Sequence, residues 1–213
     1  MRKSFLSVVL ACCFVFASQG QEEQLSARKA ASNEAQIEAT RHIDALKSGT
    51  LIVRISSGQK KRAAMQLRAS KAQLKKFKSE LYIENKELVE AFLSIYTFSK
   101  VLFIYDNDTD LLLSETKPNV FVNPKTLKVD KSITLNEKEP YYILETERIY
   151  FETQNSSSTG FVVLDKDLNY LKDPFPYYIM RMEGFITQKS ITVMVEKLEK
   201  KLTEFYAMYG TKY

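Results

Sequence analysis

Three aspartates at alternate positions, Asp106, Asp108 and Asp110, follow the apolar run Val101–Tyr105. Such a run is typical of a strand buried on both faces, and α/β sheets place their ligand sites at the carboxyl ends of these strands. Carboxylates are the ligands that hard cations such as Mg²⁺ and Ca²⁺ prefer. The spacing therefore makes the three aspartates a candidate metal site. The alternative is a solvated turn, which Asp and Asn residues form readily after a strand.

The same stretch resembles the first motif of the haloacid-dehalogenase-type phosphatases, an apolar strand followed by Asp-x-Asp-x-Thr. The resemblance implies that Asp106 attacks phosphorus, that Asp108 acts as acid and base, and that Mg²⁺ neutralises the phosphate. It covers only Val101–Asp110, and Asp110 stands where the family has Thr or Val. A metal-assisted, phosphatase-like hydrolase with Asp106 and Asp108 as catalytic residues is therefore an alternative function.

A second candidate site is basic. The segment Gln59–Ser79 carries eight Lys and Arg residues, among them Lys71, Lys75 and Lys78, and no acidic residue. On a helix these charges spread over one broad face, which can dock on lipid headgroups, acidic polysaccharide or an acidic protein. A helix face that is simply solvated is the alternative. We expect no nucleic-acid partner, because aromatic residues that could stack on bases are not interleaved with the charges.

A third candidate site is the tyrosine-rich second half of the chain. Its candidate binding residues are Tyr141, Tyr142, Phe175, Tyr177 and Tyr178. Tyrosine suits interfaces because it buries a large area at low entropic cost and keeps a polar tip. It suits the core of a sheet equally well. The chain contains no Trp, which argues against a sugar-stacking platform.

Several common kinds of chemistry lack their residues. His42 is the only histidine, so a multi-histidine metal site is impossible and any Ser-His-acid triad would have to use it. We expect His42 to pack on a helix beside alanines. Glycine-rich phosphate loops and Gly-x-Ser-x-Gly elbows are absent from the sequence. These gaps favour a protein that is not an enzyme and that holds no cofactor, with Mg²⁺ or Ca²⁺ as the alternative.

The first twenty of the 213 residues predict export. A short positive start is followed by the apolar run Ser4–Ala17 and by small residues up to Gly20, which is the layout of a signal peptide. Removing Arg2 and Lys3 with it lowers the formal charge from +5 to +3. Both cysteines lie in this segment, so residues 21–213 can form neither disulfides nor thiolate metal sites. We expect a periplasmic or secreted protein without a membrane span.

A strand–helix–strand unit must position the acidic and basic candidates. Residues 21–47 predict a helix and residues 50–56 a strand; a long amphipathic helix over Gln59–Tyr96 then leads to a strand over 100–106. A straight helix of that length is too long for the domain, so we expect a bend or break near Ser70 or Ser79. The two strands should be parallel. The apolar stripe of the helix comprises Leu67, Leu74, Phe77, Leu81, Leu88, Phe92 and Ile95.

The rest of the chain predicts antiparallel hairpins and a final helix. Short β-like runs occupy residues 119–123, 131–135, 141–153, 160–164, 168–171 and 175–182, and an apolar seam predicts a helix over 191–209. The order of elements resembles that of uncharacterised exported bacterial proteins, on Leu51–Arg54, Asn85–Phe92, Val101–Tyr105 and Gly160–Tyr178. The fold class predicted for residues 21–213 is a single mixed α/β domain, with α+β as the alternative.

The function predicted from these observations is a non-enzymatic binding or interaction module of the cell envelope or extracellular space. Its partner would be a protein or an anionic envelope component, met through the tyrosine-rich side or the basic helix face.

Overall fold

The computed structural model describes residues 30–114, 119–136, 138–151, 156–183, 187–188 and 190–211. The predicted signal peptide lies outside the described residues. Of the predicted N-terminal helix, the described part is helical from residue 30 to residue 48. Within the described chain, no helix is both long enough and apolar enough to cross a bilayer.

A five-stranded mixed sheet forms the centre of the molecule, and the predicted mixed α/β fold is confirmed. Its strands are β1 (Thr50–Ile55), β2 (Lys100–Tyr105), β5 (Tyr141–Phe151), β6 (Ser156–Leu164) and β7 (Tyr178–Met180), in the order β2-β1-β5-β6-β7. β1 lies between β2 and β5 and pairs with both in parallel, as predicted for β1 and β2. The β5–β6 and β6–β7 pairs are antiparallel.

The two faces of the sheet bury alternate residues of each strand, because successive side chains in a strand point to opposite sides. One face, with Leu51, Val53 and Phe103, packs under helix 30–48, α3 (Lys71–Ile95) and α5 (Ile191–Tyr209). The other face, with Ile52 and Ile104, is covered by the connection from β2 to β5. That connection contains η1 (Asp106–Asp108), α4 (Thr109–Leu113), β3 (Val122–Asn123) and β4 (Lys128–Val129).

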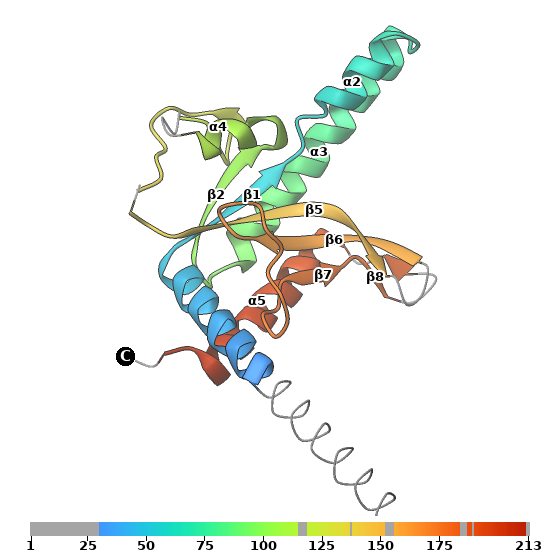
Figure 1. Ribbon diagram of the computed structural model, residues 1–213. Coiled ribbons are helices and arrows are strands. Elements are labelled where there is room, and N and C mark those ends of the chain that lie inside the picture. Colours follow the sequence, from blue (N-terminus) through green and yellow to red (C-terminus); the bar gives the residue numbers. More distant parts are fainter. Residues whose placement is uncertain are drawn as a thin grey trace, which may run out of the picture.

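The predicted long helix is two helices. α2 (Gln59–Gln66) and α3 are separated at residues 67–70, which confirms the break expected near Ser70. The Ser70 hydroxyl accepts a hydrogen bond from the Gln73 backbone N–H, and the Gln73 side chain accepts one from the Ser70 N–H. This capping box starts a new helix and satisfies two amide donors that would otherwise be free. Figure 1 shows the resulting helical hairpin projecting from the body of the molecule.

The final helix is present as predicted, but two of the short predicted strands are not. The predicted C-terminal helix is confirmed as α5, whose seam of Val195, Leu198, Leu202 and Phe205 is buried. The predicted run at 131–135 is irregular, and the run at 168–171 contributes only an isolated bridge between Tyr170 and Leu164. Short pieces β8 (Met182–Glu183) and β9 (Thr187–Gln188) pair with each other. Short apolar runs are thus poor evidence for strands, because a loop that covers a sheet face also needs apolar residues.

Candidate functional site

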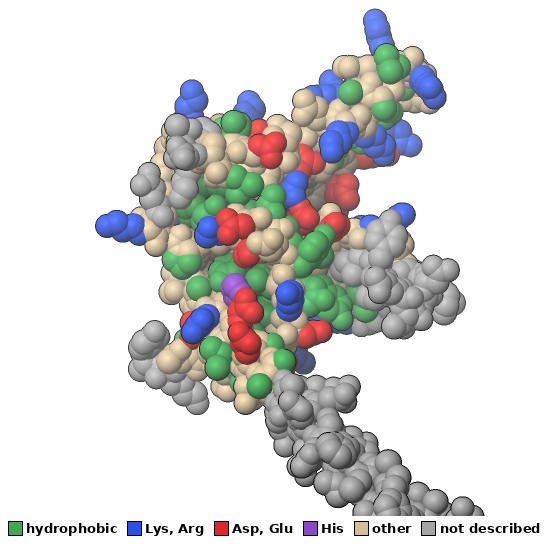
Figure 2. Space-filling model, viewed as in Figure 1, with side chains coloured by type: hydrophobic (Ala, Val, Ile, Leu, Met, Phe, Trp, Pro, Cys, Tyr) green, Lys and Arg blue, Asp and Glu red, His purple; other side chains and the backbone are tan. Residues whose placement is uncertain are grey.

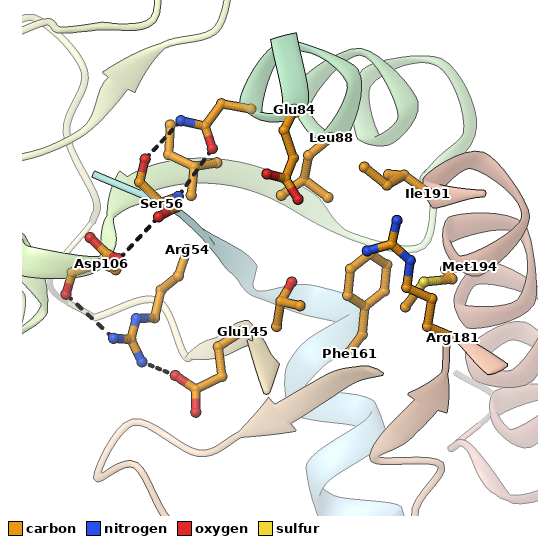
Figure 3. A pocket seen from close by; sticks show the side chains of 13 residues that line it. Arg54, Ser56, Glu84, Leu88, Asp106, Glu145, Phe161, Arg181, Ile191 and Met194 are labelled. Atoms are coloured by element: carbon orange, nitrogen blue, oxygen red, sulfur yellow. Dashed lines mark hydrogen bonds and ion pairs between the residues drawn. The ribbon is translucent and has the colours of Figure 1, made fainter. Parts of the chain in front are cut away.

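Asp106 lies where β2 ends, and it ties this edge of the sheet to the end of β1. Its carboxylate accepts a hydrogen bond from the Ser57 backbone N–H at 2.9 Å and a longer one from the Ser56 hydroxyl at 3.5 Å. Its backbone carbonyl accepts a bond from the Arg54 guanidinium at 3.3 Å. Figure 3 shows Asp106, Ser56 and Arg54 facing one another. The resemblance to phosphatases makes Asp106 the nucleophile. In the structure its carboxylate instead accepts hydrogen bonds that connect the ends of β1 and β2.

The other two aspartates of the predicted metal site, Asp108 and Asp110, have different surroundings. Asp108 accepts a hydrogen bond from the Asn107 side chain at 2.7 Å. Burial, and secondly the charge of Asp106, raise the pKa of the Asp108 carboxyl. Asp110 is exposed in the first turn of α4. Among the described residues, no group of three or more His, Cys, Asp or Glu side chains is placed to hold a metal ion. The metal-assisted hydrolase stays a prediction that this geometry does not favour.

The structure divides the tyrosine-rich candidates between the core and two surfaces. Tyr142 and Phe175 are 5% and 1% exposed and lie in the core under the helices. Tyr141, the residue before Tyr142, packs against the opposite face of the sheet. Tyr177 and Tyr178 are half-buried, with ring centroids 4.9 Å apart. Because alternate residues of a strand point to opposite sides, these side chains do not form one continuous patch.

His42 belongs to the same part of the core. Its Nδ1 lies 2.9 Å from the Tyr142 hydroxyl, and its ring meets Phe175 edge-on at 6.3 Å. Burial, and secondly the charge of Asp165, raise the pKa of Tyr142 to about 12. A phenol that stays protonated can donate to the histidine or accept from it. The predicted packing role of His42 is what this arrangement provides.

The basic candidates lie together on the projecting hairpin. We call residues 59–84, which comprise α2, the turn and the outer half of α3, the arm. No residue of the arm is buried, and the first buried residue of α3 is Asn85. Lys71, Lys75 and Lys78 are all exposed. In Figure 2 basic side chains surround the outer part of the arm, and acidic ones lie closer to the body.

The arm holds its shape through a thin apolar seam and a glycine at its base. Leu74, Phe77 and Leu81 are half-buried, and the Lys61 ammonium lies 4.9 Å from the centre of the Phe77 ring. Gly58 precedes α2 with φ +63°, and a Cβ there would lie 2.4 Å from Leu81 Cδ2. Only glycine accepts both the left-handed backbone and this close approach without strain.

Leu67 corrects the predicted apolar stripe. It occupies the turn between α2 and α3 and is 84% exposed, so it does not continue the buried seam. The helical period was right on both sides of Leu67, but the chain reverses direction there. The tip of the arm therefore presents a free leucine among basic side chains, with Arg68 next in the sequence.

A pocket that sequence reasoning missed lies at the carboxyl end of β1, where its parallel pairing with β5 stops at Val53 and Leu144. It has a volume of about 350 Å³ and an apolar floor that includes Leu88, Phe161 and Met194. Arg54 pairs with Glu145 at its rim (Figure 3). One signal was available: Arg54 interrupts the apolar strand Leu51–Ile55, and a charge in a buried strand needs a partner. For the other polar residues of the pocket the sequence carries no such signal, because they become neighbours only through the fold.

Comparisons with models of protein families, with curated proteins and with solved structures found no match. The resemblances described from short motifs stay predictions, and no activity is carried over with them.

Proposed function

We propose that this protein is an exported, non-enzymatic binding module of the cell envelope that docks on an anionic lipid surface through the tip of its arm. The single observation that carries the proposal is the arm itself. It projects from the body, has no buried residue, combines eight basic with no acidic residues over Gln59–Ser79, and ends in an exposed Leu67.

The positive charge of the arm decides which kind of partner it can bind. Two copies of the chain would bring two strongly positive arms together, which like-charge repulsion opposes. An anionic surface attracts the same side chains, and each Lys or Arg near such a membrane contributes about 1 kcal/mol. The acidic residues of α3, Glu80, Glu84, Glu87 and Glu90, follow the basic segment and lie towards the body. The positive charge is thus concentrated at the outer part of the arm.

Leu67 selects lipid over an acidic polysaccharide or an acidic protein surface. A leucine that is exposed in water gains about 2 kcal/mol when its side chain is fully buried in an apolar layer. A bilayer interface offers that layer directly beneath its charged headgroups, whereas a polysaccharide offers charge alone. Four basic contacts and one inserted leucine sum to roughly 6 kcal/mol, a dissociation constant between millimolar and micromolar. The docking we propose is therefore reversible.

The test is co-sedimentation of the purified protein with phosphatidylcholine vesicles, with and without phosphatidylglycerol. We expect binding only to the anionic vesicles, and release at high salt because exposed charges are screened. Replacing Lys71, Lys75 and Lys78 by Gln should weaken binding at least tenfold, since each contributes about 1 kcal/mol. Leu67→Ser should weaken it by about tenfold or more without changing the salt dependence.

The matched control replaces Lys128, Lys131 and Lys172 by Gln. These lysines are exposed but lie outside the arm, and their loss lowers the net charge by the same amount. An equal loss of binding in the two triple variants would mean that net charge acts without the arm. Absence of binding to anionic vesicles by the unmodified protein would contradict the proposal and favour an acidic protein as the partner of the arm.

A further inference from the structure

A pocket at the base of the arm lies where the parallel pairing of β1 and β5 ends, a position at which α/β folds place small ligands. The chain leaves β1 towards β2 on one side, while β5 lies on the other side of β1. Such a switch point opens a crevice outside the carboxyl ends of the strands. The β1–β5 ladder ends at Val53 and Leu144, one residue before Arg54 and Glu145 line the pocket.

The charges at the two ends of this pocket differ in how they are satisfied. At one end, Arg54 is neutralised by its ion pair with Glu145 and by the carbonyl of Asp106. At the other end, Glu84 from α3 and Arg181 from the end of β7 enter the pocket from opposite sides (Figure 3). Among the described residues, neither charged group has a hydrogen-bond or ion-pair partner. Glu84 is exposed, whereas the Nε of Arg181, like that of Arg54, is buried and unsatisfied.

Two charges of opposite sign that line one pocket without a protein partner fit a ligand that carries both. A buried donor without an acceptor costs free energy, and a carboxylate is the acceptor that a guanidinium binds best. A simple carboxylate would leave Glu84 unpaired beside the new negative charge. An ammonium group on the same ligand removes that repulsion.

The apolar part of the pocket supplies the third contact. Leu88, Phe161, Ile191 and Met194 line it from α3, β6 and the first turn of α5. They offer a surface for a hydrocarbon side chain, and a volume of about 350 Å³ is that of a site for one small molecule. We propose that the pocket binds an apolar α-amino acid, with the carboxylate on Arg181, the ammonium on Glu84 and the side chain on the apolar floor.

The test is isothermal titration calorimetry of the purified protein with three probes that differ by one charge each. L-leucine carries both charges, leucinamide lacks the carboxylate, and N-acetyl-leucine lacks the ammonium group. We expect leucine to bind at least tenfold more tightly than either analogue, because each analogue leaves one pocket charge unpaired.

Two variants then assign the contacts. Arg181→Gln should remove the preference for leucine over leucinamide and keep most of its preference over N-acetyl-leucine. Glu84→Gln should do the reverse. Arg148→Gln, an exposed arginine of β5 that does not line this pocket, is the control and should leave all three affinities unchanged.

The result that overturns the proposal is equal binding, or no binding, of the three probes to the unmodified protein. Equal effects of both variants on all probes would also overturn it, because they would mean that Glu84 and Arg181 act only on the fold. Both outcomes are independent of vesicle binding, since the variants leave the basic residues of the arm intact.

Discussion

The two halves of α3 are one continuous helix in two different environments. From Asn85 onwards the helix is embedded in the core, where the fully buried Phe92 ring meets the rings of Phe103 and Phe161. In the arm, the same helix has no buried residue, and its half-buried side chains face α2 and Gly58. The apolar spacing is similar in both halves. Hydrophobic periodicity therefore specifies a helix face but not the amount of core that will cover it.

The largest expected difference between the halves is in their contribution to global stability. Phe92→Ala should lower the free energy of unfolding by about 3–5 kcal/mol, because it opens a cavity in the core. Phe77→Ala should cost about 1 kcal/mol or less, because Phe77 lies in a half-open seam. Urea denaturation of both variants measures this. Equal losses of unfolding free energy would mean that the arm is part of the cooperative core. They would contradict the contrast between the two halves of α3.

The next largest effect concerns the joint between the halves. The side chain of Asn85 accepts a hydrogen bond from the Ser56 N–H at 3.1 Å and donates one to the Ser56 carbonyl at 2.7 Å. Asn85→Ala should cost about 2 kcal/mol, because it leaves partly buried backbone groups without partners. Thermal unfolding measures the loss, with the exposed Lys86→Ala as a control that should change stability by less than about 0.5 kcal/mol.

A smaller effect is expected at the base of the arm. Gly58→Ala should cost about 1 kcal/mol, because alanine disfavours the left-handed backbone and its Cβ meets Leu81. The cost should fall on α2 alone. Hydrogen exchange should become faster over residues 59–66 while the exchange of β1 and β2 stays unchanged. Faster exchange throughout the sheet would show that the arm and the body unfold together.

The smallest effect separates two neighbouring aspartates on the body side of the joint. Because the pKa of Asp108 is raised, the folded state disfavours its charged form relative to the unfolded state. The free energy of unfolding therefore falls as pH rises and Asp108 loses its proton. Asp108→Asn should therefore stabilise the protein at pH 7 by less than about 1 kcal/mol and give no gain below pH 3.8.

Asp106→Asn should act in the opposite direction. It removes the charge from a carboxylate that accepts the Ser57 N–H next to the arm. Melting curves of both variants between pH 3 and pH 7 make the measurement. The same curves recorded with millimolar Mg²⁺ test the acidic turn as a metal site, since a cation bound only to the folded state raises the melting temperature.

Much of the fold could be predicted from the sequence because the responsible patterns are local. The β-branched run at Thr50–Ile55, the apolar run at Val101–Tyr105 and the seam of α5 each specify their element without long-range information. The length of the helical pattern likewise predicted a break near Ser70 or Ser79, and the structure has it at residues 67–70. The sequence did not show whether the chain bends or reverses at this break. That depends on whether another part of the molecule covers Leu67, and a local pattern holds no such information.

The candidate sites were harder to predict because they depend on residues from distant segments. Lys71, Lys75 and Lys78 were identifiable, since their charges are contiguous in the sequence. Glu84 and Arg181 were not, because they are almost a hundred residues apart and meet only through the packing of α3, β7 and α5. Tyr142 and Phe175 were predicted as binding residues but are buried in the core. Their residue types are favoured at interfaces and in cores alike.

The length of the arm also sets a stand-off distance. The fourteen residues of α3 that belong to it, 71–84, rise about 21 Å at 1.5 Å per residue. At physiological ionic strength the Debye length is about 8 Å. A protein docked by its tip would therefore keep its sheet more than two Debye lengths from the lipid headgroups. With the arm upright, the headgroup field would be largely screened at the sheet. Ligand binding in the pocket beside Arg54 and Arg181 would then depend little on the charge of the membrane.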